Sequence, residues 1–466
     1  MLTRLKVRGF KSLEEIEVHF GPFTCVAGVN GVGKSNLFDA IMFLRDLADT
    51  SIIDAATRIR NSDRRRINLS ALFTRTSKGQ VQSMDFEVDF LVGDKVIDDF
   101  GREAKPKVTF LQYKLGLRYV PAIDAKPEAI ELVYECLDFV QKGDAKRRLG
   151  FSVSQEFFDS VYQGSSRSDF IYMDKENPSI AKVRQDGSSG QPISIPIDKA
   201  ERTILSNINT IDRPTALAAR REMQSWINLQ LESSSLRKPD DFSPNSRVSP
   251  TGEHLPAALH RLKKFDEVAA QLANLLPDIK SLHVDIDERR ELKTLYLETV
   301  GGITHEARAL SDGTLRFLAL AIIGADPEAG GVICLEEPEN GIHPARIPAM
   351  VELLGDMAVS PQYAVGEDNP LRQIIINTHS PLVIQKLQTQ DIVLSQAYKR
   401  DGAALSIYSP VLGTWRTKSG LDSETEAVTF VALLDYLGAG KEDELVPGKE
   451  NVAQMFHQLE LDCRVQ

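Results

Sequence analysis

A glycine-rich segment near the N-terminus constrains this chain more than any other part of its sequence. Residues 28–35, GVNGVGKS, match the pattern G-x-x-x-x-G-K-[ST]. The apolar run FTCVA precedes the segment, and apolar residues recur at helical spacing after Lys34. A strand, a glycine loop and a helix in this order present backbone N–H groups and a helix N-terminus to phosphate oxygens. The segment therefore predicts a phosphate-binding loop, here called the P-loop, followed by a helix that begins near Lys34.

The P-loop also predicts which side chains bind the nucleotide. Lys34 is expected to reach the β- and γ-phosphates, and the Ser35 hydroxyl is expected to bind Mg²⁺. We therefore expect ATP and Mg²⁺ as ligands. The predicted nucleotide-binding residues of this segment are Asn30, Gly31, Val32, Gly33, Lys34, Ser35 and Asn36.

A second apolar strand, residues 332–335, is followed directly by Glu336 and Glu337. A P-loop enzyme needs a strand that ends in an acid, which holds Mg²⁺. Glu336 fits that role, although Asp is more usual there, and Glu337 fits the base that deprotonates the attacking water. Adjacent strand residues point to opposite faces, so both carboxylates can act only if the strand ends and the backbone turns. Pro338 supplies that stop.

Two further segments carry candidate phosphate contacts. In ALSDGTLR, residues 309–316, Ser311 is a good N-cap and Gly313 leaves the helix start open to an anion. In QIIINTHSP, residues 373–381, a buried strand ends near His379, which is a candidate contact to the γ-phosphate. Taken alone, the first segment is also an ordinary helix start, and a lone histidine is most often structural.

Four motifs in this order resemble ABC-class ATPase heads of the SMC, RecF and OLD type: GVNGVGKSN, LSDGTLRFLALA, CLEEPENGIHP and INTHSP. The opening LTRLKVRGFKSLEEIEV resembles the first strands of the same group. The signature departs from LSGGQ as Leu-Ser-Asp-Gly-Thr. The resemblance implies an α/β fold: a P-loop ABC/SMC-type ATPase head with an antiparallel β subdomain and a mainly helical insertion.

The resemblance also implies a site shared between two copies of the chain. ATP is expected to be hydrolysed with Glu337, His379 and Lys34 as catalytic residues. Each ATP would be sandwiched between the P-loop of one subunit and Ser311, Asp312 and Gly313 of another, in a head-to-head homodimer or higher homo-oligomer. The loop at 339–344 resembles a D-loop that crosses to the partner. A Q-loop glutamine is also expected, and the candidates are Gln80, Gln82 and Gln112.

Periodicity divides the chain into four expected segments. Residues 1–120 form the N-terminal half of the head, because alternating runs over 81–120 predict antiparallel strands after the P-loop. Residues 121–280 show polar loops between short helical stretches and are expected to be a mainly helical insertion. Residues 281–400 form the C-terminal half, where helix and strand patterns alternate beyond residue 310 and predict a parallel sheet. Residues 401–466 form a C-terminal extension.

Charge and composition exclude other classes. The net charge of −11 argues against a surface that is basic all over, so nucleic acid would have to bind a local patch. Residues 58–66, RIRNSDRRR, are such a patch, or equally a solvated loop. The longest uncharged apolar run, residues 317–325, is too short to cross a membrane. The N-terminus lacks a secretory apolar region, and four scattered cysteines fit neither a disulfide nor a zinc pattern, so a cytoplasmic protein is expected.

Three functions compete for such a head. A built-in nuclease is disfavoured, because the residues after His379 contain no D-x-D pair and are too few for a Toprim domain. A transporter ATPase is disfavoured, because about 275 residues separate Ser35 from Ser311. The chain most resembles stand-alone SMC-like ATPases encoded beside a nuclease, such as PtuA of the Septu antiphage system. That resemblance implies an ATPase that regulates a separate effector, expected to be a nuclease, and the alternative is a RecF-type ATPase that acts directly on DNA.

Overall fold

The computed structural model describes residues 1–59, 68–123, 127–166, 168–186, 190–242, 247–417, 427–438 and 446–447. Most of the basic cluster at 58–66 lies outside the described residues. The chain forms two compact units, the first with Met1–Trp226, Pro361–Val365 and Gln388–Gln466, the second with Ile227–Ser360 and Gly366–Leu387. These units do not separate at residue 121 or at residue 281. The strands Phe110–Val120 and Ala129–Phe139 pair across the first position, and the strand Ile279–Asp287 contains the second.

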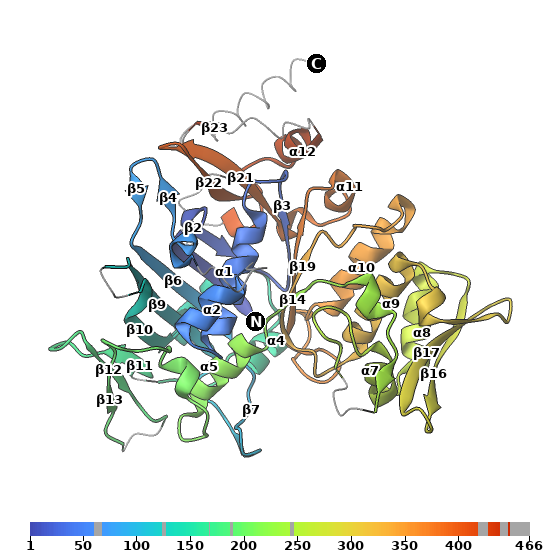
Figure 1. The fold of residues 1–466 in the computed structure, drawn as a ribbon, viewed down its shortest axis with the longest axis horizontal. Helices are drawn as coiled ribbons and strands as arrows, with labels where there is room; N and C mark the ends of the chain where they lie inside the picture. Colours follow the sequence, from blue (N-terminus) through green and yellow to red (C-terminus); the bar gives the residue numbers. More distant parts are fainter. Residues whose placement is uncertain are drawn as a thin grey trace. The chain divides into compact units, whose positions relative to one another are not determined.

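The first unit is built on an eight-stranded antiparallel sheet with the strand order β13-β12-β11-β10-β9-β6-β1-β2 (Figure 1). Buried and partly exposed residues alternate along β1, because successive side chains of a strand point to opposite faces. The sheet strands are β1 (Leu2–Phe10), β2 (Leu13–His19), β6 (Ser83–Leu91), β9 (Phe110–Val120), β10 (Ala129–Phe139), β11 (Ile171–Met173), β12 (Ile180–Val183) and β13 (Ile193–Pro196).

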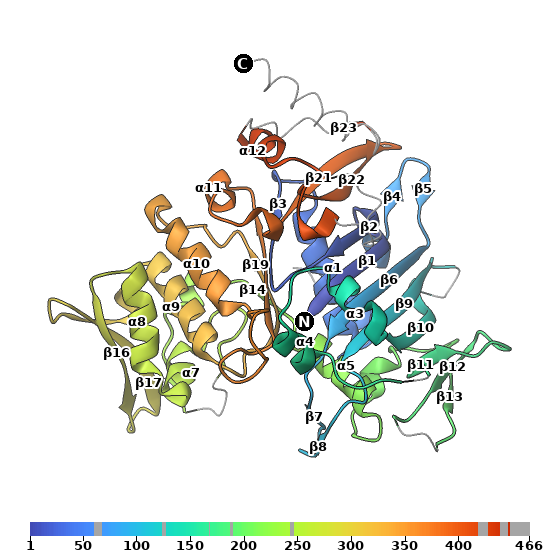
Figure 2. The ribbon, with the colours of Figure 1, turned by 180° about the vertical axis from the view of Figure 1, so that it is seen from behind.

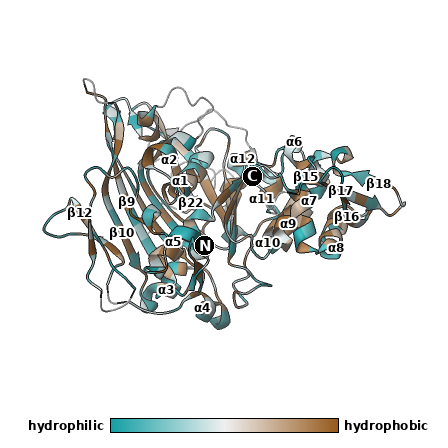
Figure 3. Cartoon of the chain, turned by 60° about the horizontal axis from the view of Figure 1, so that its bottom comes forward, coloured by the Kyte–Doolittle hydropathy of each residue, from teal (hydrophilic) through white to brown (hydrophobic). Residues whose placement is uncertain are grey.

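The segment expected to be a mainly helical insertion, residues 121–280, supplies both strands and helices. Its strands β10 to β13 extend the large sheet. Hydrophilic residues prevail around β12, near the edge of this sheet (Figure 3). Its helices are α3 (Lys142–Leu149), α4 (Gln155–Val161), α5 (Pro214–Gln224), α6 (Ser233–Leu236), α7 (Leu255–Leu262) and α8 (Phe265–Leu275).

Helix α1 (Lys34–Leu47), which follows the P-loop, is anchored on the large sheet by three phenylalanines. The ring centroid of Phe43 lies 5.7 Å from that of Phe10 in β1 and 5.9 Å from that of Phe86 in β6. All three side chains are buried. Aromatic pairs of this kind contribute about 0.5–1.5 kcal/mol each beyond the area that they bury. The packing therefore fixes the position of the helix that carries Lys34.

The C-terminus of α1 is held by residues from the 121–280 segment. The Thr203 hydroxyl donates to the carbonyl oxygen of Leu47 at 2.9 Å, and Nε of Arg220 donates to that of Ala48 at 3.0 Å. The last carbonyl groups of a helix have no partner within the helix, so these donors satisfy them. Thr203 and Arg220 are both buried. One role of this segment is thus to hold the C-terminal end of the helix that follows the P-loop.

The first unit also contains β3 (Phe23–Ala27), the strand before the P-loop. Strand β3 pairs in parallel with β21 (Ile392–Arg400), which pairs antiparallel with β22 (Ala403–Pro410). The remaining elements are α2 (Ile52–Arg58), β4 (Arg75–Thr76), β5 (Gly79–Gln80), β7 (Val96–Ile97), β8 (Glu103–Ala104), α12 (Phe430–Gly438), β23 (Val446–Pro447) and the 3-10 turns Leu69–Leu72, Leu205–Asn207, Thr389–Asp391 and Trp415–Thr417.

The second unit confirms the predicted alternation of helix and strand beyond residue 310. Strands β14 (Ile227–Leu229), β19 (Gly331–Glu336) and β20 (Arg372–Thr378) are parallel. Along the chain, α9 (Asp312–Ala325) leads into β19, and α10 (Ile347–Met357) lies between β19 and β20. From Leu315 onward almost every residue of α9 is buried. Among the described residues, no helix combines the length and the apolar character needed to cross a lipid bilayer.

A small antiparallel sheet completes the second unit, with β15-β17-β16 in order and β18 beside β17. Helix α8 packs against both β16 and α9, as Figure 2 shows. Strands β16 and β17 pair as an antiparallel hairpin, with His283 opposite Tyr296. The remaining elements are β15 (Asp240–Asp241), β16 (Ile279–Asp287), β17 (Leu292–Thr299), β18 (Thr304–Glu306), α11 (Pro381–Ile384) and the 3-10 turns Ala307–Ala309 and Pro344–Arg346.

Candidate functional site

In the first unit, the P-loop connects β3 to α1, as the sequence predicted. Gly31 and Gly33 have φ angles of 80° and 95°, which side-chain-bearing residues rarely adopt. A Cβ atom on Gly33 would lie 2.0 Å from Oγ of Ser406, whereas nothing lies within 4 Å of a Cβ atom on Gly31. Gly33 is therefore required by both conformation and packing, and the loop has free space at Gly31.

The start of α1 has the geometry of an anion site. Gly33 is its N-cap, without a side-chain cap, and the first turn holds no acidic residue. The carbonyl oxygen of Val32 accepts from the Ser406 hydroxyl at 2.8 Å, and that of Gly33 accepts from the Tyr408 hydroxyl at 2.9 Å. In a trans peptide the carbonyl and the next N–H point in opposite directions, so the N–H groups of Gly33 and Lys34 point away from these β22 side chains.

Lys34 lies inside the P-loop. Its side chain is buried, and Nζ donates to the carbonyl oxygens of Gly28 at 2.7 Å and Val29 at 2.8 Å. In the first turn of α1, the Asn36 amide donates to the Ser12 hydroxyl at 2.7 Å. Three features suit phosphate oxygens. The start of α1 has no side-chain cap, the backbone at Gly31 has free space beside it, and Lys34 supplies a positive charge. Ser406, Tyr408 and Ser12 were not predicted, since only tertiary folding brings them to the loop.

In the second unit, β19 ends at Glu336 and the backbone turns at Glu337, as the two-carboxylate hypothesis requires. The φ angle of Glu337 is 45°, a value that is uncommon outside glycine and persists only when its surroundings enforce it. The Glu337 N–H donates to the carbonyl oxygen of Asn377 at 3.0 Å and to its Oδ1 at 3.1 Å. Asn377 of β20 thus holds the turn that takes Glu337 out of the strand alternation.

The structure brings together two of the predicted catalytic residues, Glu337 and His379. Nδ1 of His379 lies 2.9 Å from Oε1 of Glu337. The other carboxylate oxygen, Oε2, accepts from Nδ2 of Asn340 at 2.7 Å. The Glu337 side chain is 27% exposed and that of His379 is 42% exposed. Glu337 is therefore oriented at both oxygens and remains accessible to solvent.

A third carboxyl group of this region, Glu339, was not predicted. Its Oε1 accepts from the Thr378 hydroxyl, whose oxygen accepts in turn from the Ser380 N–H at 2.9 Å. The side chain is only 8% exposed, and burial raises the pKa of Glu339. Among the described residues, Oε2 of Glu339 has no hydrogen-bond partner. Its place in a polar loop gave no sign of this burial.

The signature segment begins α9 as predicted. The Ser311 hydroxyl accepts from the Thr314 N–H at 3.2 Å, which confirms Ser311 as the N-cap. Asp312 forms an ion pair with Arg237, which directly follows α6, and hydrogen bonding to that guanidinium lowers the pKa of Asp312. Arg237 also donates to the carbonyl oxygen of Leu310 at 3.0 Å. Arg237 therefore holds the start of the signature helix from within the same chain.

The loop that resembles a D-loop lies against the signature helix. Nη1 of Arg316 donates to the carbonyl oxygen of Asn340 at 2.8 Å. A Cβ atom on Gly313 would lie 3.4 Å from the carbonyl oxygen of Gly341. In this structure the loop therefore contacts the signature helix of its own chain.

The three Q-loop candidates lie in the first unit. The Gln112 side chain is buried in β9 and donates to Oδ1 of Asp89 at 2.8 Å. The Gln80 side chain donates to the carbonyl oxygen of Ser70 at 2.8 Å, and Gln82 is exposed. The structure thus gives Gln112 and Gln80 partners within this unit.

The predicted site residues are divided between the two units. The P-loop residues belong to the first unit, whereas Ser311, Asp312, Gly313, Glu336, Glu337 and His379 belong to the second. In the described part of the chain, no group of three or more His, Cys, Asp or Glu side chains is placed to hold a metal ion. Binding of Mg²⁺ by Ser35 and Glu336 stays a prediction.

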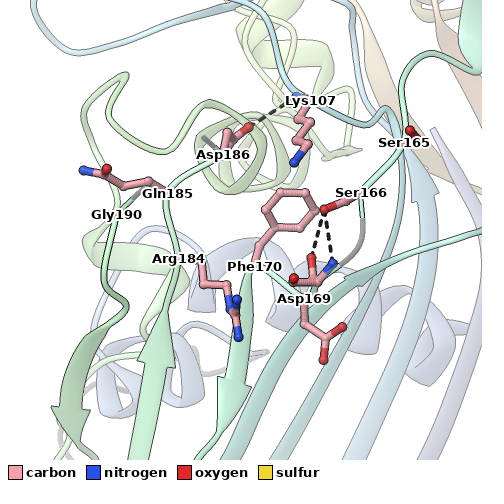
Figure 4. Close-up of a pocket in the computed structure, with 10 residues that line it drawn as sticks. Lys107, Ser165, Ser166, Asp169, Phe170, Arg184, Gln185, Asp186 and Gly190 are labelled. Carbon is pink, nitrogen blue, oxygen red and sulfur yellow. Dashed lines mark hydrogen bonds between the residues drawn. The ribbon is translucent and has the colours of Figure 1, made fainter. Parts of the chain in front are cut away.

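A separate cavity of about 470 Å³ opens in the first unit, beside β11 and β12. Figure 4 shows Lys107, Arg184, Asp169 and Phe170 around it. The Arg184 guanidinium lies over the ring of Tyr172, and Nη2 donates to the Tyr172 hydroxyl at 3.1 Å. None of the predicted site residues lines this cavity.

Comparison with protein families identifies the chain. The model of a family described as "AAA domain, putative AbiEii toxin, Type IV TA system" matches residues 139–385, more than half of the chain. The chain belongs to this AAA domain family. A second model, described as "AAA domain", matches residues 4–108 of the AAA protein. The two matches include the P-loop, the signature segment, both carboxylates and His379.

Two curated proteins share short segments with the AAA protein. The OLD nuclease of Thermus scotoductus is 46% identical over 41 residues, which are 9% of this chain and 8% of that protein. The DNA replication and repair protein RecF of Phocaeicola vulgatus is 42% identical over 45 residues, 9% of this chain and 12% of that protein. The AAA protein thus matches about a tenth of the length of these two relatives. The motifs of the chain resemble those of OLD and RecF proteins.

Solved structures that the chain matches include heads of SMC proteins. The Smc head bound to the C-winged helix domain of ScpA is 13% identical, with a TM-score of 0.47, and covers 88% of this chain and 98% of its own. The SMC head domain from Thermotoga maritima is 13% identical, with a TM-score of 0.40 and the same two coverages.

Proposed function

We propose that this AAA protein binds ATP with Mg²⁺ and hydrolyses it, with Glu337 as the general base. One observation carries the proposal: Glu337 follows β19 at a backbone turn, and His379 and Asn340 orient its two carboxylate oxygens. A general base must be fixed within hydrogen-bond reach of the water that it deprotonates. A carboxylate that is both oriented and accessible to solvent is suited to that role, which supports the proposal.

The other residues bind and orient the nucleotide in this proposal. The N–H groups at the start of α1 and Lys34 hold the phosphates, and Ser35 and Glu336 hold Mg²⁺. The bound metal ion neutralises charge that develops on the phosphoryl group. His379 keeps Glu337 oriented and contacts the γ-phosphate. Catalysis of phosphoryl transfer depends mainly on such positioning and on electrostatic stabilisation.

We further propose that ATP closes a head-to-head homodimer, or a higher homo-oligomer. Each ATP then contacts the P-loop of one subunit and Ser311, Asp312 and Gly313 of the other. The N-terminus of α9 supports this assignment, because the partial positive charge of a helix start favours an anion. The Arg237–Asp312 ion pair holds that helix start in one conformation before the partner arrives.

Two variants test the ATPase and the dimer together. Lys34→Ala is expected to abolish ATP binding, while Glu337→Gln is expected to keep binding, lose hydrolysis and accumulate an ATP-dependent dimer. Size-exclusion chromatography with light scattering measures the dimer, and phosphate release measures turnover. Glu352→Gln, an exposed change on α10, serves as the control. Normal hydrolysis by Glu337→Gln would reject Glu337 as the base.

For the biological role, we propose that ATP-driven closure regulates a separate effector, expected to be a nuclease, in antiphage defence. The resemblance to PtuA-type ATPases of systems such as Septu supports this role. The family description supports it too, because a toxin–antitoxin system pairs two components. The test is to purify the chain with the product of its adjacent gene and measure nuclease activity with ATP, with ADP and with Glu337→Gln. Nuclease activity that is the same with ATP, with ADP and with Glu337→Gln would count against regulation by the ATPase.

A second candidate function is ATP-dependent action on DNA, and the local identity to RecF favours it. In that case the basic cluster at 58–66 would contact phosphates, and binding would weaken as salt rises. Duplex DNA binding by the wild type and by Lys34→Ala, with and without ATP, separates this function from effector control. ATP-dependent binding without any effector supports the RecF-like alternative.

A further inference from the structure

We infer that Asn340 is a positioning residue for Glu337, and that Arg316 links this contact to the signature helix. The inference rests on the proposed function, because it takes Glu337 as the base. It assigns a role within one chain to a loop that was expected to act on a partner subunit. The contacts that carry it all lie in the second unit.

Asn340 binds Glu337 through both its backbone and its side chain. The Asn340 N–H donates to the Glu337 carbonyl oxygen at 3.0 Å, which closes a turn. Its Nδ2 donates to Oε2 of Glu337 at 2.7 Å. A hydrogen bond to an ionised carboxylate is shorter and stronger than a neutral one. The Asn340 amide thus fixes the direction of the Glu337 carboxylate at Oε2. His379 contacts the same carboxylate at Oε1.

Arg316 holds the same loop from α9. Its Nη1 donates to the Asn340 carbonyl oxygen at 2.8 Å, one and a half turns after Ser311 begins the helix. Its Nε is buried and has no partner among the described residues. The close approach of Gly313 to the Gly341 carbonyl adds a second contact between helix and loop. A shift of α9 therefore moves Asn340, and Asn340 moves the Glu337 carboxylate.

The consequence concerns turnover rather than ATP binding. Glu337 has a positive φ angle, so its backbone keeps this conformation only while neighbouring contacts enforce it. A misplacement of about 1 Å in a reacting group can lower a rate by about a hundredfold. Binding of a partner subunit to the signature segment would thus change the position of Glu337 in the chain that carries this segment. The change would pass through Arg316 and Asn340.

The isosteric change Asn340→Asp separates positioning from a purely structural turn. Aspartate keeps the size of asparagine and the backbone N–H, but it replaces the amide donor by an acceptor that repels Glu337. We expect Asn340→Asp to lower kcat at least about tenfold, and more than Asn340→Ala, with the KM for ATP unchanged. A normal kcat in Asn340→Asp would overturn the inference. This test holds even when Asn340→Ala fails to fold.

A double-mutant cycle tests the link to the signature helix. Arg316→Ala is expected to lower kcat in the wild type and to have little further effect in Asn340→Ala, because both act on one contact. Independent effects that multiply would reject the link. Arg308→Ala and Asn177→Ala are matched controls, since both residues are exposed and outside the site, and Arg308 forms an ion pair with Glu306.

The Glu337→Gln variant distinguishes failure of the proposed function from failure of the positioning role of Asn340. If Glu337→Gln retains hydrolysis, the proposed function fails first. If Glu337→Gln is inactive while Asn340→Asp turns over normally, the base assignment stands and only the positioning role is wrong.

Discussion

His379 and Glu337 are in hydrogen-bond contact, with Nδ1 of His379 2.9 Å from Oε1 of Glu337. The contact follows from the register of two parallel strands, β19 and β20, which places Glu336 beside Asn377. Because parallel strands in register end at the same edge of a sheet, the residues just beyond their ends become neighbours. The contact between Glu337 and His379 is therefore a property of the sheet.

His379→Ala is expected to lower the rate of ATP hydrolysis about tenfold to a hundredfold and to lower ATP affinity by a smaller factor, because the contact to the γ-phosphate is lost. The substitution removes the partner of Oε1, so the Glu337 carboxylate loses one of the contacts that orient it. Phosphate release and binding of a fluorescent ATP analogue measure the two effects. His305→Ala in β18 is the control. Unchanged turnover in His379→Ala would contradict the orienting role.

Ser406→Ala combined with Tyr408→Phe is expected to weaken ATP binding about tenfold while kcat changes little. The two hydroxyl groups hold the carbonyl oxygens of Val32 and Gly33, and each such bond contributes about 1 kcal/mol. Without them the P-loop N–H groups lose their common direction. Titration calorimetry with ATP measures the loss, with Ser409→Ala as control. Wild-type affinity in the double variant would show that the loop keeps its shape unaided.

Glu135 is expected to make stability depend on pH. Burial raises its pKa to about 7, although its oxygens accept from the N–H groups of Ile204 and Leu205 and from the Tyr113 hydroxyl. Between the ordinary value of 4.5 and about 7, the folded chain holds a proton that the unfolded chain has lost. Stability therefore falls as pH rises through this window, by at most about 3 kcal/mol.

The measurement for Glu135 is the difference in thermal unfolding midpoint between the wild type and Glu135→Gln across this pH window. The amide cannot ionise, so the difference should change with pH over the window and become constant above it. Glu131→Gln, a more exposed position of the same strand, should show no such change. A pH-independent difference for Glu135→Gln would contradict the prediction.

Arg372→Met is expected to loosen the second unit. The buried guanidinium donates to four carbonyl oxygens, at Gly324, Asp326, Ala329 and Met357, near the ends of α9 and α10. Burial lowers the pKa of Arg372 to about 10, and the side chain is fully buried in β20. Carbonyl groups left without partners cost about 1–3 kcal/mol each before relaxation.

Amide hydrogen exchange in the last turn of α9 checks the Arg372 prediction. Protection there should fall by at least about tenfold in Arg372→Met, and Arg372→Lys should lie between, because lysine keeps the charge but loses the fork of donors. Arg247→Met removes an exposed ion pair with Glu328 and should leave exchange unchanged. Equal protection in Arg372→Met and wild type would exclude this anchoring role.

The sequence by itself determined the local parts of the candidate site. Strand, glycine loop and helix around Lys34 are set by spacing and by the conformational freedom of glycine, and the structure has them where predicted. The end of β19 and the N-cap at Ser311 also follow from neighbouring residues. Each of these features depends on contacts within a few positions of the chain.

Only the tertiary structure decided what orients these parts. Ser406 and Tyr408 turn the P-loop carbonyls, Thr203 caps α1 and Glu339 is buried, although each belongs to a segment without a local signal for that role. The expected helical insertion extended a sheet for the same reason, since strand pairing is set by distant partners. Local patterns fix an element because its bonds are short-range, whereas the direction of a side chain or carbonyl depends on whatever folding places beside it.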